Sequence, residues 1–129
     1  MIEFQNFKDK KFLETKVCCW HCCHTFKNMP CGIPINYKKN LFYVKGIFCS
    51  FNCALTYNNN SNENENIIQE RESLIYLLYK KINNVKNIDL KYAPEKEVLE
   101  MFGGKLTIEE FRENNSTYNI IFPPIVFLK

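Results

Sequence analysis

Two closely spaced pairs of cysteines limit what this chain of 129 residues can fold into more than any other feature. Two residues separate Cys19 from Cys22, and three separate Cys49 from Cys53. A structural zinc site needs four ligands in a tetrahedron, and one tight turn can point both thiolates of such a pair at the same ion. The two pairs therefore predict a single closed site of four thiolates around one structural zinc ion.

The residues between and after the pairs predict the fold around that site. Residues 33–37 and 41–48 are rich in strand-forming side chains, and residues 38–40 join them as a β-hairpin. Ser50 is placed to cap a helix whose first turn contains Cys53, where the positive helix end favours a thiolate. A knuckle at residues 19–22, a hairpin and a helix that supplies the last ligand form a treble-clef-like zinc finger.

The spacing leaves the choice of ligands open within the first cysteine cluster. Cys18 with Cys22, and Cys19 with Cys23, also have workable spacing. Five further potential ligands lie nearby in the sequence: Cys18, His21, Cys23, His24 and Cys31. A second zinc ion would have to be bound by overlapping turns, because only the second pair lies outside this cluster. We therefore expect one ion.

Other uses of the cysteines fit the sequence less well. Their number, seven, is odd, and the N-terminus lacks the pattern of an export signal, so a disulfide framework is disfavoured. A redox pair of Cys19 and Cys22 would need the strand-to-helix junction of a βαβ unit, which the sequence does not predict. A site with four thiolates leaves no open position for a substrate, so we expect no enzymatic activity. His24 is expected to support the site by hydrogen bonding, and Trp20 to pack over the knuckle.

The charge of the chain is unevenly distributed. Residues 1–60 carry eight lysines and three acidic groups, a net charge of +5, whereas residues 61–129 carry nine basic and eleven acidic groups, a net charge of −2. The basic half contains no arginine, the side chain best suited to bidentate binding of phosphate or guanine. We therefore expect a protein partner rather than DNA. The apolar runs are too short to span a bilayer, so a soluble, non-secreted protein without membrane contact is expected.

A polar stretch at residues 57–66 predicts the boundary between two parts of the chain. We expect a zinc-finger module at residues 1–60 and a helical region at 61–129, packed together as one unit. Asn62 and Glu65 match an N-cap signal, and helical spacing of apolar residues predicts one amphipathic helix over residues 63–84. Its apolar stripe is expected to pack against the same chain, because it is too short for a sustained coiled coil.

The last third of the chain predicts two short helices and an extended end. Pro94 begins the first and Gly103 ends it, while Thr107 and Glu110 form a capping box for the second. Residues 118–122 and 125–128 are expected to be extended segments. The predicted fold class is thus a small α+β protein.

Several strings of residues together resemble one viral family. The finger contains CWHCCHTF at 19–26, GIPI at 32–35 and FYVKGIFCSFNCA at 42–54, and the second half contains FGG at 102–104 and TIEEFR at 107–112. This combination resembles the late transcription factor 2 family of nucleocytoplasmic large DNA viruses, with its FCS/MYM-type zinc finger. The resemblance covers residues 18–129.

The resemblance implies both a ligand set and a function. The zinc ligands fall on Cys19, Cys22, Cys49 and Cys53. The implied function is a zinc-binding accessory protein for late transcription, with viral RNA polymerase and other late transcription factors as partners and weak or promoter contact with DNA as a further option. The implied location is the viral factory in the host cytoplasm, with packaging in the virion as a further option. The alternatives are a zinc-finger adaptor without a transcriptional role and a thiol-disulfide oxidoreductase.

Overall fold

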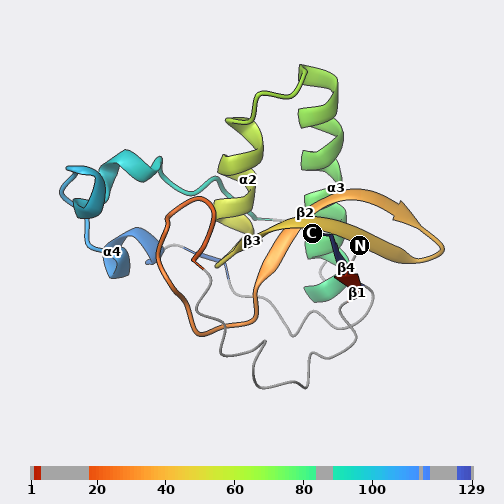
Figure 1. Cartoon of the computed structure of the whole chain (residues 1–129), viewed down its shortest axis with the longest axis horizontal. Helices are drawn as coiled ribbons and strands as arrows, with labels where there is room; N and C mark the ends of the chain where they lie inside the picture. The colour runs from red at the N-terminus through yellow and green to blue at the C-terminus, as the bar shows by residue number, and fades with distance from the viewer. Residues whose placement is uncertain (1, 4–17, 84–88, 114, 117–124, 129) are drawn as a thin grey trace.

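A four-stranded sheet with the order β1-β4-β3-β2 joins segments from both ends of the chain (Figure 1). The computed structural model describes residues 2–3, 18–83, 89–113, 115–116 and 125–128. The strands are β1 (Ile2–Glu3), β2 (Cys31–Lys38), β3 (Leu41–Phe48) and β4 (Ile125–Leu128). Strand β4 runs antiparallel to β1 and parallel to β3, and β3 runs antiparallel to β2. The fold class is therefore the predicted small α+β.

Strands β2 and β3 form the predicted hairpin. Lys39 and Asn40 make its turn with positive φ angles of 53° and 63°, the conformation of a turn that matches the natural twist of the strands. Tyr37 of β2 and Phe42 of β3 are paired across the strands next to this turn, and their rings stack with centroids 4.2 Å apart. The hairpin prediction is confirmed, and β2 begins two residues earlier than expected, at Cys31.

Two helices pack against β2 and against each other. Helix α2 (Phe51–Asn59) is capped as predicted, because the Ser50 hydroxyl accepts a hydrogen bond of 3.1 Å from the backbone of Cys53. Helix α3 (Glu65–Asn83) corresponds to the predicted amphipathic helix. The prediction of Asn62 as its cap is wrong: the side chain of Asn64 accepts the hydrogen bond from Ile67 instead, at 2.9 Å.

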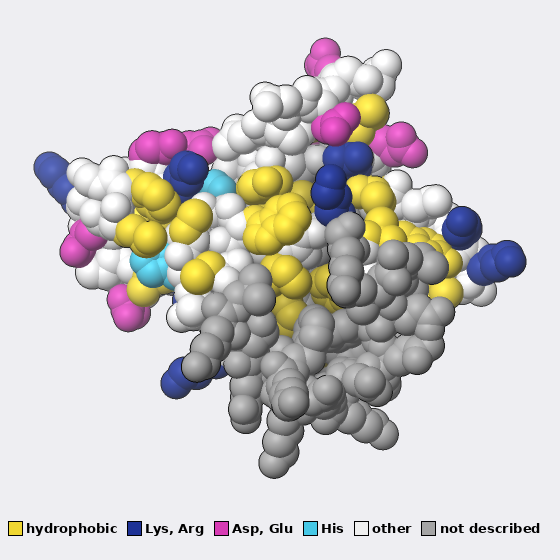
Figure 2. All heavy atoms as spheres, viewed as in Figure 1, with side chains coloured by type: hydrophobic (Ala, Val, Ile, Leu, Met, Phe, Trp, Pro, Cys, Tyr) yellow, Lys and Arg dark blue, Asp and Glu magenta, His cyan; other side chains and the backbone are white. Residues whose placement is uncertain are grey.

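The core lies between the sheet and these two helices. Ile75 and Leu78 of α3 are fully buried, as are Phe42, Phe48 and Phe51. The apolar stripe of α3 therefore packs within its own chain, as expected. Not all large apolar side chains are covered, and one face of the molecule shows exposed hydrophobic groups among charged ones (Figure 2).

The segment after α3 differs from the predicted pair of helices in one respect. The expected helix from Pro94 is replaced by two 3-10 turns, η1 (Lys96–Val98) and η2 (Glu100–Phe102). Leu99 between them is extended, with ψ 143°, because it forms a parallel bridge to Leu106. Gly103 ends this segment as predicted, in the left-handed conformation common for a glycine that follows a helix, with φ 89°.

The final elements bear out the capping prediction. Helix α4 (Ile108–Arg112) begins with both hydrogen bonds of the Thr107–Glu110 capping box. The extended segment predicted at residues 125–128 is strand β4, whereas the one predicted at 118–122 lies outside the described residues. The division of the chain after residue 60 stays a prediction. In the part of the chain that is described, no helix has the length and apolar character needed to cross a membrane.

Leu78→Ala is expected to destabilise the protein by about 2 to 5 kcal/mol, because it leaves a cavity between α3 and the sheet. Chemical denaturation followed by circular dichroism measures this cost. Lys80→Ala on the exposed side of the same helix is the control and should change stability by no more than about 0.5 kcal/mol. An equally small cost for Leu78→Ala would show that α3 is not anchored through this side chain.

Candidate metal centre

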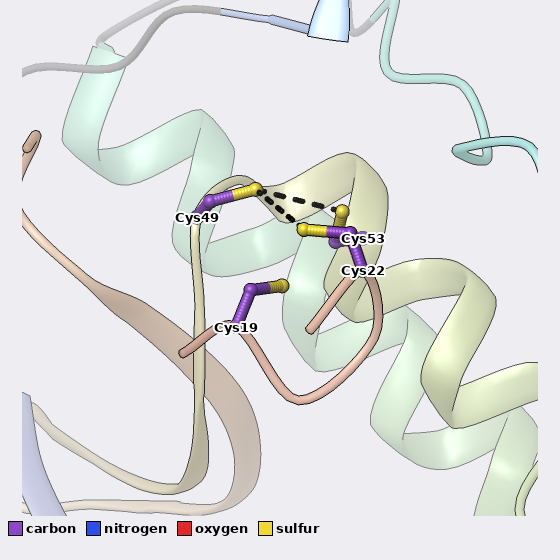
Figure 3. Close-up of side chains that lie close together, drawn as sticks. All are labelled: Cys19, Cys22, Cys49 and Cys53. Atoms are coloured by element: carbon purple, nitrogen blue, oxygen red, sulfur yellow. Dashed lines mark hydrogen bonds between the residues drawn. The ribbon is translucent and has the colours of Figure 1, made fainter. Parts of the chain in front are cut away.

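Four cysteine side chains from three separate segments point toward one another (Figure 3). Cys19 and Cys22 lie in the loop before β2, Cys49 directly follows β3, and Cys53 lies in the first turn of α2. Their sulfur atoms all lie within 4.8 Å of one another. Each residue is at least 96% buried, since the most exposed of them, Cys49, is 4% exposed.

Backbone hydrogen bonds shape the loop that carries the first two thiols. The amide of Cys23 donates to the carbonyl of Cys19 at 2.9 Å, and the amide of Cys19 donates to His24 at 3.0 Å. Cys23 adopts a left-handed conformation with φ 61°, which closes the turn. The amide of Trp20 donates to Ile47 at 2.8 Å and so fastens the loop to β3. This tight turn brings the thiols of Cys19 and Cys22 to the same side, as the spacing predicted.

The distances between the sulfurs fit a zinc ion held by four thiolates. Four sulfurs that each lie about 2.3 Å from one zinc ion lie about 3.8 Å from one another. The Sγ atom of Cys49 lies 3.9 Å from that of Cys22 and 3.6 Å from that of Cys53. A disulfide would need a separation of about 2.05 Å, so these are separate thiols. The donor set, its burial and its spacing all match a structural zinc site.

The four thiols differ strongly in their affinity for protons. Hydrogen bonding to Cys19 is the largest cause that lowers the pKa of Cys22 and of Cys49. The pKa of Cys19 is raised, chiefly by hydrogen bonding to Cys22, and that of Cys53 is raised, chiefly by hydrogen bonding to Cys19. Without a cation the cluster therefore keeps some of its protons, and a bound divalent metal would replace them.

Arg112 of α4 contacts the cluster from the C-terminal half of the chain. Its Nη2 atom donates to the sulfur of Cys22 at 3.5 Å and to the carbonyl of Thr25 at 3.0 Å. Burial acts to lower the pKa of Arg112, but Cys49 and Cys22 outweigh it and hold the pKa above its ordinary value. Sequence reasoning missed this role. The only signal for it was an arginine at the end of a well-capped helix, which says nothing about what the side chain touches.

The other candidate ligands lie outside the four-sulfur cluster. Cys18 is exposed. The thiol of Cys31 donates to the carbonyl of Phe48 at 3.6 Å, and that of Cys23 to His21 at 3.8 Å. Among the described residues, the group of side chains close enough to hold a metal is the one formed by the two predicted pairs. That these four bind the metal remains a prediction.

The neighbouring histidines and the tryptophan have structural contacts. His24 donates from Nδ1 to the carbonyl of Cys22 at 2.6 Å, in line with the expected supporting hydrogen bond. The ring of His21 is buried and donates from Nε2 to the carbonyl of Pro94 at 2.8 Å, which fastens the knuckle to the segment before η1. Trp20 packs edge-on against Phe48 and stays 42% exposed, so its ring is only partly covered.

Comparison with known proteins finds relatives in large DNA viruses. The chain is 36% identical to an uncharacterized protein of Acanthamoeba polyphaga mimivirus over 96% of its own length and 37% of the relative's. It is also 36% identical to an uncharacterized protein of Invertebrate iridescent virus 6, over 55% of this chain and 34% of the relative. An uncharacterized protein of African swine fever virus is 32% identical over 72% of this chain and 55% of the relative. The chain thus spans between about a third and just over half of the length of these relatives.

These relatives all come from nucleocytoplasmic large DNA viruses, the viral group that the resemblance implied. The chain matches no family model and no solved structure.

Cys49→Ser is expected to abolish zinc binding, because it removes one of four ligands and leaves the other thiols without a cation. Cys31→Ser, a change of the same kind at a buried cysteine outside the cluster, should retain one zinc per chain. Elemental analysis of both purified proteins measures the difference. A full zinc content in the Cys49→Ser protein would remove Cys49 from the ligand set.

Arg112→Met is expected to weaken zinc binding by about 10- to 100-fold without abolishing it, the range typical for residues that hydrogen bond to a metal ligand. Competition with a chromogenic chelator measures the affinity. Arg112→Lys should restore part of it, since it keeps the charge, and Lys105→Met on an exposed surface should have no effect. An unchanged affinity in Arg112→Met would make this contact a packing contact only.

Proposed function

We propose that this chain is a structural zinc protein that assists the transcription of late genes in cells infected by a large DNA virus. The observation that carries the proposal is the convergence of its motif strings on one site. The knuckle string supplies Cys19 and Cys22, the FCSFNC string supplies Cys49 and Cys53, and the TIEEFR string supplies Arg112, which contacts Cys22. Segments that are far apart in sequence and that carry the family resemblance therefore contribute side chains to the same site.

The arrangement supports a treble-clef-like finger as the form of this site. A knuckle, a hairpin and the first turn of a helix provide the four sulfurs, which is the order of parts in such a finger. Ser50 caps that helix by accepting a hydrogen bond from the backbone of Cys53, which fixes Cys53 in the first turn. A finger of this kind holds its ion for stability.

The same arrangement supports a role without catalysis. Four thiolates complete the coordination of a zinc ion and leave no position for water or a substrate. A thiol-disulfide enzyme, the alternative from another class, needs a free dithiol, whereas Cys19 and Cys22 share a cluster with two further thiols. One zinc per chain, tightly held, would count strongly against that alternative.

The proposed partners are viral RNA polymerase and other late transcription factors, with at most weak contact to DNA. The modest net charge of +3 supports a protein partner, because strong DNA binders concentrate many more basic side chains on one face. An adaptor without a transcriptional role would share the zinc site and differ only in its partners.

Silencing of the gene in infected cells tests the transcriptional role. Late viral transcripts are expected to fall while early transcripts persist, and sequencing of viral RNA over the course of infection measures both. Re-expression of the Cys31→Ser protein should restore late transcripts, whereas the Cys49→Ser protein should not. Unchanged late transcripts after silencing would refute the role and leave the adaptor alternative.

A further inference from the structure

Two neighbouring aromatic side chains are exposed beside the knuckle. Trp20 is 42% exposed and Tyr57 is 37% exposed, and their ring centroids lie 5.9 Å apart. Both pack on the fully buried ring of Phe48, at 6.1 and 5.2 Å. Gly46 makes room for this arrangement, because a Cβ atom there would lie 2.6 Å from the ring of Phe48 and 3.1 Å from that of Trp20. The aromatic pair is therefore held in place before any partner arrives.

An acidic hollow borders this pair on one side. It has a volume of about 640 Å³ and is lined by Glu95 and Glu97 together with both aromatic rings. That volume lies within the range of about 300 to 1,000 Å³ typical of ligand sites. Asn60 donates to the carboxylate of Glu95 at 2.8 Å and so fixes its position. The ammonium group of Lys96 lies over the ring of Phe102, 5.3 Å from its centroid.

A smaller, more basic hollow also borders this pair and shares Ser61 and Asn62 with the first. Its volume is about 160 Å³, and its walls include Ile33 and Ile35 together with Lys45 and Arg71. The apolar walls suit a small aliphatic side chain, and the two cations suit a neighbouring carboxylate.

A buried acceptor in this second hollow lacks a partner. Asn58 lines the hollow and is only 2% exposed. Its amide nitrogen donates to Ile68 at 2.9 Å, but its Oδ1 atom has no hydrogen-bond donor among the described residues. The hydroxyl of Ser61, which lines both hollows, is also without a partner there. Both atoms expose less than 1 Å² to solvent, so a bound molecule can donate to them only if the neighbouring side chains move.

We define the aromatic groove as the Trp20–Tyr57 pair with the two hollows beside it. One face of the molecule shows hydrophobic side chains with both acidic and basic side chains near them (Figure 2). The groove likewise combines both signs of charge, since Glu95 and Glu97 line one hollow and Lys45 and Arg71 line the other.

The charges of the groove argue against nucleic acid as its occupant. Glu63, Glu95 and Glu97 offset the three cations Lys45, Arg71 and Lys96. Single-stranded nucleic acid binds to grooves that are positive along their whole length, because every nucleotide carries a phosphate. A peptide, in contrast, can carry opposite charges at its two ends and so match both hollows.

We propose that the aromatic groove binds an extended peptide segment of a partner protein. A basic side chain of the peptide packs on the aromatic pair and approaches Glu95 and Glu97, as cations do on aromatic faces. An aliphatic side chain enters the smaller hollow, and an acidic side chain beyond it approaches Lys45 and Arg71. The proposal concerns the surface alone and stands whether or not the partner belongs to the transcription machinery.

Intrinsic fluorescence tests this directly, because Trp20 is the only tryptophan of the chain and lies in the groove. The full chain is titrated with the synthetic peptide Asp-Asp-Ala-Leu-Ala-Arg-Arg and with the same residues in reverse order. One of the two is expected to shift the emission of Trp20 in a saturable manner. Two control peptides carry four Asp residues or four Arg residues at the charged positions. Each should bind at least about tenfold more weakly than the mixed peptide that binds, a difference of about 1.4 kcal/mol in binding free energy.

Charge reversal of single side chains of the protein is the second part of the experiment. Glu97→Lys should weaken binding of the mixed peptide by about tenfold. The variant should bind the peptide with four Asp residues more tightly than the mixed peptide. Glu113→Lys makes the same charge change at an exposed position outside the groove and should bind as the unaltered protein does. Lys45→Glu, in the smaller hollow, should instead bind the peptide with four Arg residues more tightly than the mixed peptide. Circular dichroism confirms that each variant is folded.

Two results would overturn the proposal. The first is the absence of any fluorescence response to both mixed peptides, or a response that Glu97→Lys and Lys45→Glu leave unchanged. The second is tighter binding of a single-stranded oligothymidine than of either mixed peptide, which would make the groove a stacking surface for nucleic acid. Neither result would alter the zinc content or the late-transcript readout, so failure here is distinguishable from failure of the proposed function.

Discussion

Four sulfur atoms within 4.8 Å of one another cannot all be negatively charged unless a cation lies among them. Burial makes this constraint stronger, because little water reaches the cluster to weaken the repulsion. A divalent ion removes the conflict and at the same time joins the knuckle, the end of β3 and the start of α2. The arrangement of the N-terminal half therefore depends on what occupies the space between these thiols.

The C-terminal half depends on the same centre through a few long-range contacts. Arg112 reaches Cys22, and His21 reaches the carbonyl of Pro94, so both contacts begin or end in the knuckle. Asn52, one residue before Cys53, donates to the carbonyl of Lys91 at 2.8 Å. The aromatic groove lies where these parts meet, and Trp20 stands between two proposed ligands. Loss of the metal should therefore disturb the groove as well as the finger.

Features set by neighbouring residues could be predicted from the sequence, and features set by distant ones could not. The hairpin, the cap at Ser50 and the capping box at Thr107 each follow from a few adjacent side chains, and each is confirmed. The choice of Asn64 over Asn62 as a cap depends on where α3 begins, which local chemistry leaves uncertain by one or two residues. The two 3-10 turns arise because Leu99 pairs with Leu106, a contact that helical propensity does not reveal. The same holds for the cluster: spacing predicted the thiol pairs, but only the folded chain places Arg112 beside them.

The order of the sheet has a consequence for how the chain is assembled during synthesis. Strand β4 is the last strand in sequence, yet it lies between β1 and β3. The sheet therefore cannot close until residues 125–128 have been synthesised, and the edge of β3 stays open until then. The four thiols, in contrast, are all present once residue 53 has emerged. A nascent chain could thus bind a metal at these thiols first, and the segment that holds it would then be the template on which the late strand is placed.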